Sequence, residues 1–168
     1  MRKTLKGKKQ INRIMNNYLR KFGLKTFLDT DFSAYMEDKE IGYALIVTDA
    51  SDKYFIPFCE SIDKDVKADA FLLSMFHEIG HHMTWDDFSD AQIDKGWAAK
   101  EIIEQIIKET DDKEVIAREN YNYFNLPEER AATEWGINYI KTHADEVADL
   151  WRRLQPAIIR FFKKNHLI

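Results

Sequence analysis

Several features are missing from this chain of 168 residues, and each absence narrows the class of protein. A single cysteine, Cys59, excludes an internal disulfide, and we interpret it as a small buried hydrophobic residue. No run of 18 apolar residues and no charged-then-apolar leader occurs, which predicts a protein without a membrane segment. Internal repeats and low-complexity linkers are also absent. Together these absences predict a cytoplasmic protein with a single domain spanning residues 1–168.

Acidic residues are absent from positions 1–25, which hold nine Lys or Arg. This leaves 16 of the 25 basic residues and all 29 acidic residues for the rest of the chain. A basic arm of this kind could bind nucleic acid or an acidic partner. Its apolar residues nevertheless recur at helical spacing, which favours an amphipathic helix docked on the protein. They are Ile11, Ile14, Met15, Tyr18, Leu19 and Phe22.

The segment after this arm has the composition of β-strands. Four short runs rich in aromatic and β-branched residues are separated by turns that contain Asp. They cover residues 25–29, 32–37, 41–49 and 53–60. The rest is helical in pattern and ends in a helical extension from about residue 143 to 168. We therefore predict an α+β fold with an N-terminal helix, a small antiparallel sheet of three to four strands and a mostly helical second half.

The most informative pattern is His-Glu-Ile-Gly-His at positions 77–81. It lies in a segment, 64–84, that lacks proline and has apolar residues at helical spacing. Four residues of helix turn through about 400°, so His77 and His81 share one face. In the His-Glu-x-x-His arrangement, two such imidazoles bind one zinc ion and the carboxylate, here Glu78, is a general base. The pattern predicts a zinc-dependent hydrolase.

A catalytic zinc usually has three protein ligands and one open position, so a third ligand must come from elsewhere. Asp87 is one candidate, but it requires a glycine-mediated turn and Thr84 occupies the glycine position. His82 points about 100° away from the neighbouring ligand. Glu129 is the candidate that we favour. The alternative is that Glu128 and Glu129 only complement the positive end of a helix.

Small residues surround Glu129 on its helical face, namely Ala132, Thr133 and Gly136. Gly80 lies between the two histidines in the predicted helix, where glycine costs about 1 kcal/mol relative to alanine. This indicates a close approach of another backbone or of a substrate. Ala132 and Gly136 would let the two helices pack closely near Gly80 and bring Glu129 to the metal. Thr133 is then a candidate hydrogen-bonding partner within the site.

Cleavage of an amide also requires a group that stabilises the oxyanion. Tyr121 and Tyr123 precede the helix that carries Glu129 and are candidates, although a tyrosine in such a segment more often packs in a core or an interface than takes part in catalysis. His143 shares the face of Glu129, but 14 residues of helix place it about 21 Å away. His166 has no visible role.

The two motifs together resemble a known family. Residues 129–136 read Glu-Arg-Ala-Ala-Thr-Glu-Trp-Gly and resemble the Glu-x-x-Ala-x-x-Phe-Ala pattern of ImmA/IrrE-type metallopeptidases. The resemblance covers roughly residues 8–142. Thr133, Trp135 and Gly136 stand where that family has Asn, Phe and Ala, and a helical insert at about 89–110 is additional.

The resemblance implies a zincin-like fold with one zinc per chain held by His77, His81 and Glu129, and with Glu78 as the base. It also implies proteolysis of a partner protein, such as a DNA-binding regulator of a mobile element or a stress response. The alternative is a zinc-containing regulatory or antagonist protein that binds its partner without cutting it. A nucleic-acid-binding protein that uses the arm at 1–25 ranks last.

Overall fold

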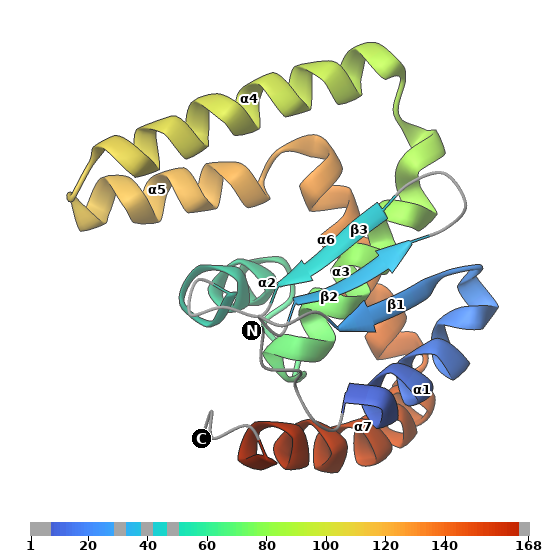
Figure 1. Cartoon of the computed structure of the whole chain (residues 1–168). Coiled ribbons are helices and arrows are strands. Elements are labelled where there is room, and N and C mark those ends of the chain that lie inside the picture. The colour runs from blue at the N-terminus through green and yellow to red at the C-terminus, as the bar shows by residue number, and fades with distance from the viewer. Residues whose placement is uncertain (1–7, 29–32, 38–41, 47–50, 165–168) are drawn as a thin grey trace, which may run out of the picture. The chain divides into compact units, whose positions relative to one another are not determined.

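A computed structural model describes residues 8–28, 33–37, 42–46 and 51–164 (Figure 1). The chain divides into two compact units. The first contains Met1–Val47 and Thr142–Ile168, and the second contains Thr48–Lys141. Within the described residues, no helix is both long and apolar enough to cross a membrane.

The first unit contains helices from both ends of the chain and three short strands. Its elements are α1 (Lys8–Leu19), the 3-10 helix η1 (Arg20–Phe22), β1 (Lys25–Leu28), β2 (Ser33–Glu37), β3 (Gly42–Ile46) and α7 (Ala144–Lys164). The backbones of β1 and β2 pair antiparallel, as do those of β2 and β3. Helix α1 contacts both β1 and α7.

The amphipathic helix predicted in the basic arm is confirmed. Four of its apolar side chains are buried, at Ile11, Met15, Tyr18 and Leu19. The Tyr18 hydroxyl also donates a hydrogen bond to Glu146 of α7 at 2.5 Å. The apolar face of α1 is therefore used for packing within the first unit.

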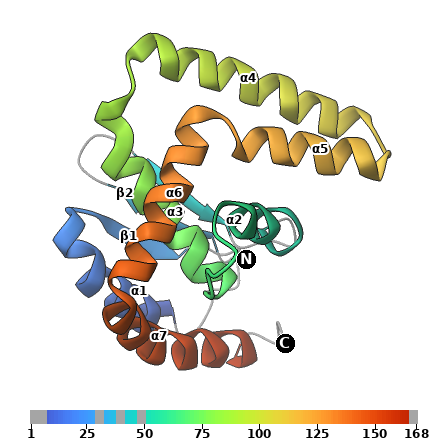
Figure 2. The same cartoon turned by 180° about the vertical axis from the view of Figure 1, so that it is seen from behind.

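The second unit is helical. Its elements are η2 (Ser51–Phe55), α2 (Ile56–Ile62), α3 (Ala70–Thr84), η3 (Trp85–Asp87), α4 (Asp90–Glu109), α5 (Lys113–Phe124) and α6 (Pro127–Thr142). Helices α4 and α5 lie side by side as a hairpin, as both views show (Figures 1 and 2). A capping box formed by Ser89 and Gln92 starts α4, and the side chain of Asp112 starts α5.

The predicted α+β class is wrong. In residues 9–25 and 53–164, where side chains are described, 86% of the residues are helical. The run at 53–60, predicted as a strand, is helical. The ends of the other predicted strands, at 29, 32, 41 and 47–49, lie outside the described residues. Helices therefore form the described core and carry the candidate site.

The error at 53–60 has a local physical cause. The aromatic residues of this run raise its β-propensity, but propensity yields to packing. Phe55, Phe58 and Cys59 are buried at helical spacing, and Pro57 lies in the first turn of α2, where its missing amide proton costs nothing. Burial on a single helical face outweighs the preference for a strand.

Candidate metal centre

Helix α3 carries the first candidate ligands through the interior of the second unit. The side chain of Asp69 caps its start by accepting a hydrogen bond from the Phe71 amide at 3.0 Å. His77 is 7% exposed, and the side chains around it are mostly buried. The last turn is tightened by Thr84, whose hydroxyl donates to the Gly80 carbonyl at 2.9 Å. Both imidazoles thus belong to a helix that is mostly buried.

Helix α6 crosses α3 with almost no separation between the backbones. A Cβ atom added at Gly80 would lie 2.2 Å from the carbonyl oxygen of Ala132. A Cβ added at Gly136 would lie 2.8 Å from the carbonyl oxygen of Phe76. The close helix packing predicted from these small residues is confirmed, and it places the first turn of α6 beside the histidines.

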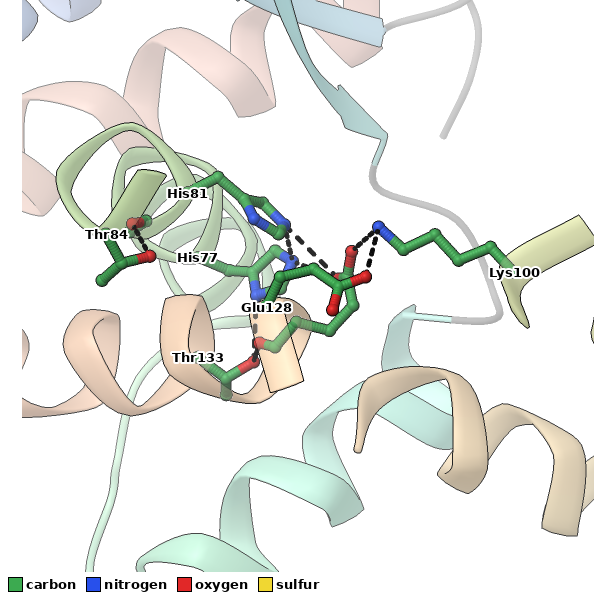
Figure 3. A network of polar contacts seen from close by, with 8 residues as sticks. His77, His81, Thr84, Lys100, Glu128 and Thr133 are labelled. Carbon is green, nitrogen blue, oxygen red and sulfur yellow. Dashed lines mark hydrogen bonds and ion pairs between the residues drawn. The ribbon is translucent and has the colours of Figure 1, made fainter. Parts of the chain in front are cut away.

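The crossing brings three potential ligand atoms together. Oε2 of Glu129 lies 3.1 Å from Nε2 of His77 and 3.4 Å from Nε2 of His81. The two Nε2 atoms are 3.1 Å apart. Among the described residues, His77, His81 and Glu129 form the one group of at least three His, Cys, Asp or Glu that could hold a metal ion, with ligand atoms within 4.8 Å of one another. Figure 3 shows both imidazoles directed at the same carboxylate.

A hydrogen bond sets the tautomer of His77. The Thr133 hydroxyl donates its only proton to the Glu129 carbonyl at 2.9 Å. It can therefore only accept from Nδ1 of His77, which is 2.9 Å away. With the proton on Nδ1, Nε2 presents a lone pair to the other two ligand atoms, as metal binding requires.

The donor set and its dimensions fit zinc. Ligand atoms that lie about 2.0 to 2.1 Å from one tetrahedral zinc ion are about 3.3 to 3.4 Å apart. The observed triangle has edges of 3.1, 3.1 and 3.4 Å. Two imidazoles with one carboxylate is also a common set for catalytic zinc.

Electrostatics at this site favour ionised Glu129 and neutral His77. Burial lowers the pKa of His77 and so favours the neutral form. Burial would raise the pKa of Glu129, but its close contacts with the imidazoles of His77 and His81 hold it well below its usual range. For His81, burial acts to lower the pKa, and the neighbouring carboxylates of Glu129 and Glu78 outweigh it, so the pKa is raised. The Nε2 lone pair of His77 and the negative charge of Glu129 thus lie together, and a metal ion would take the place of the proton that the carboxylates favour on His81.

Glu78 occupies the position next to the ligands on α3 and is partly exposed. Desolvation raises the pKa of its carboxyl group to about 8. A divalent cation nearby would lower this pKa, because it favours the charged form. Glu78 therefore has the setting of a proton acceptor that ionises when a cation is present.

Two further charged groups complete the site, and the sequence patterns did not identify their role. Nζ of Lys100, on α4, lies 2.5 Å from Oε1 of Glu129 and 3.5 Å from Oε1 of Glu128. That Glu128 oxygen is buried, and no described residue makes a hydrogen bond to it. When these four side chains are ionised and both imidazoles are neutral, the carboxylates of Glu78, Glu128 and Glu129 exceed the single ammonium by two charges. A divalent cation would neutralise this excess.

The remaining candidates lie apart from the ligand group. Asp87 is exposed in η3, and neither it nor His82 belongs to the three-residue cluster. Tyr121 is 48% exposed and its ring contacts Phe58 edge-on. Tyr123 is closer, because its ring centroid is 5.7 Å from Nζ of Lys100 and burial raises the pKa of its hydroxyl.

Two other histidines can be placed only in part. His143 is exposed after α6 and interacts with the adjacent Thr142 hydroxyl. His166 lies outside the described residues.

The sequence carries one indirect signal near Lys100. Gly96, a glycine inside a helical pattern, lies one turn earlier and indicates a close approach at this face of the helix.

Comparison of the chain with protein-family models, with curated proteins and with solved structures found no match. Its function is therefore inferred from the residues of the site.

Proposed function

We propose that this protein is a zinc-dependent endopeptidase that hydrolyses a peptide bond in a partner protein. One observation carries the proposal: His77, His81 and Glu129, from two crossing helices, bring their ligand atoms within 4.8 Å of one another beside Glu78. The pattern of a His-Glu-x-x-His helix with a distant glutamate is typical of metallopeptidases. With the fold class corrected, the likeness to ImmA/IrrE-type enzymes rests on these site residues.

The residues have distinct roles in this proposal. His77, His81 and Glu129 would hold one zinc ion per chain. When bound there, zinc would supply Lewis-acid chemistry, polarising the scissile carbonyl and lowering the pKa of water to about 7. Glu78 accepts the proton of the attacking water and later delivers it to the leaving amine. Thr133 keeps the lone pair of His77 on Nε2 by accepting from Nδ1.

A partner protein such as a DNA-binding regulator is the substrate class that the family resemblance suggests, and the cytoplasm is the compartment that we propose. Helix α1 lies within the basic arm at 1–25, and its apolar face is buried. This arm is therefore a weaker basis for function than the metal centre. We therefore propose a protein substrate in preference to nucleic acid.

Metal content tests the site directly. Elemental mass spectrometry should find one zinc per chain in the wild type and in a control variant, His143→Ala, which removes an exposed histidine outside the cluster. His77→Ala and Glu129→Ala should each lose it. A wild type that holds no zinc when supplied with it would refute the metal centre.

Glu78→Gln separates binding from chemistry. This variant should retain zinc, because Glu78 is outside the ligand group, and it should generate no new peptide termini in a cell extract. The readout is labelling of new N-termini followed by mass spectrometry, with the wild type alongside. Equal cleavage by Glu78→Gln would refute the mechanism. A zinc-loaded wild type that captures a partner and leaves its mass unchanged would instead identify the non-cleaving regulator.

A further inference from the structure

The two oxygens of the Glu129 carboxylate have different partners. Oε2 faces the histidines, at 3.1 and 3.4 Å from their Nε2 atoms. Oε1 faces Nζ of Lys100 at 2.5 Å, a charge-assisted contact (Figure 3). Lys100 is not part of the His-Glu-x-x-His pattern and lies in the helical hairpin α4–α5.

This division affects how Glu129 can bind a metal. A carboxylate can coordinate through one oxygen or through both. Binding through both would fill a further coordination position, which a catalytic zinc keeps open for water or substrate. An ammonium held on Oε1 opposes binding through that oxygen, because the cation and the metal compete for its lone pairs.

Lys100 is held in place by side chains of two other helices, α5 and α6. Its side chain is 21% exposed. Besides Glu129 of α6, Nζ lies 3.5 Å from Oε1 of Glu128 and 5.7 Å from the ring centroid of Tyr123 on α5. Two carboxylates and an aromatic face offset the cost of withdrawing an ammonium from water.

Gly96 allows α4 to come close enough for this contact. It lies one turn before Lys100, on the same face, and a Cβ at this position would be 2.1 Å from Oε1 of Glu128. Glycine inside a helix costs about 1 kcal/mol relative to alanine. The close approach of the Glu128 carboxylate accounts for a glycine at this position.

We infer that Lys100 is a positioning residue that holds Oε1 of Glu129, so that Glu129 binds the metal through Oε2 alone and the fourth position stays open. The inference rests on the proposed metal centre and adds to it a role for the α4–α5 hairpin. Lys100 acts through Glu129 and need not touch the substrate.

Cobalt(II) is the probe that tests this inference. It replaces zinc in such sites, and four-coordinate cobalt absorbs visible light much more strongly than five-coordinate cobalt. The full chain loaded with one equivalent of cobalt should show the strong absorption. In Lys100→Met, the visible absorption at the same cobalt stoichiometry should be several times weaker. Lys100→Arg keeps the cation and should absorb as strongly as the wild type. Lys108→Met, a change at a 71% exposed lysine of the same helix, should match the wild type.

Each outcome separates the two proposals. An unchanged spectrum in Lys100→Met, or weak absorption in the wild type, would overturn the role of Lys100 while leaving the metal centre intact. A wild type that binds neither cobalt nor zinc would overturn both. If circular dichroism shows that Lys100→Met does not fold, the double variant Glu128→Gln/Lys100→Met removes the second uncompensated carboxylate. The double variant should also show weaker cobalt absorption than the wild type, and an unchanged spectrum would overturn the role of Lys100.

Discussion

Replacing Gly80 with alanine should separate the helices that form the metal centre. The new Cβ would lie 2.2 Å from the carbonyl oxygen of Ala132 and under 3 Å from two more backbone atoms of that residue. Backbone atoms cannot move aside as the end of a flexible side chain can. The helices α3 and α6 must therefore separate by about 1 Å to restore normal contact distances. Overpacking of a core costs up to about 3 kcal/mol, and alanine regains about 1 kcal/mol of helix propensity. The net destabilisation is about 2 kcal/mol.

Urea unfolding followed by circular dichroism, with a chelator present, measures this change. For a slope of about 2 kcal/mol per molar urea, the midpoint should fall by about 1 M. Gly136→Ala is the matched comparison, because its Cβ would be 2.8 Å from the nearest atom, and its midpoint should fall less. Zinc content should drop in Gly80→Ala, since Glu129 moves away from the histidines. Wild-type stability and full zinc content in Gly80→Ala would refute the close crossing.

Three other outcomes are expected. Thr133→Val removes the acceptor for Nδ1 of His77 and should weaken zinc binding by about 10- to 100-fold in competition with a chromogenic chelator, whereas unchanged affinity would exclude this role. Burial raises the pKa of Cys59 to about 12, so the thiol stays protonated at pH 8, and iodoacetamide should modify it only after unfolding; equal rates for folded and unfolded chains would contradict this. Free zinc at 100 times its dissociation constant should stabilise the wild type by about 2.7 kcal/mol and leave His77→Ala unchanged, as thermal unfolding with and without chelator would show. Equal shifts in both proteins would mean that zinc binds elsewhere.

Local patterns in the sequence predicted the helical half of the fold well. Helical spacing identified α1 from Ile11, Met15 and Leu19, and it identified α3 around the motif. The strand prediction at 53–60 is wrong, because the aromatic residues of this run favour a strand while their spacing favours a helix. Phe55, Phe58 and Cys59 have the periodicity of one helical face, and tertiary burial on that face decided the structure.

The candidate site was predictable wherever its chemistry follows a spacing rule. His77 and His81 are one turn apart, and the small residues near Glu129 indicated the close crossing with α3. Lys100 has no such rule, because its 2.5 Å contact with Glu129 joins residues that are 29 positions apart. Only the return of α5 along α4 brings the lysine to the carboxylate.

The crossing at Gly80 and Gly136 has an evolutionary consequence. The two glycines serve the packing of the second unit as much as the metal, so selection for a stable fold alone would retain them. Glu78 contributes no atom to the crossing contacts of these glycines and would drift once cleavage ceased to matter. Relatives that keep both glycines and the ligands but have lost the glutamate would thus mark lineages in which a peptidase became a binding protein.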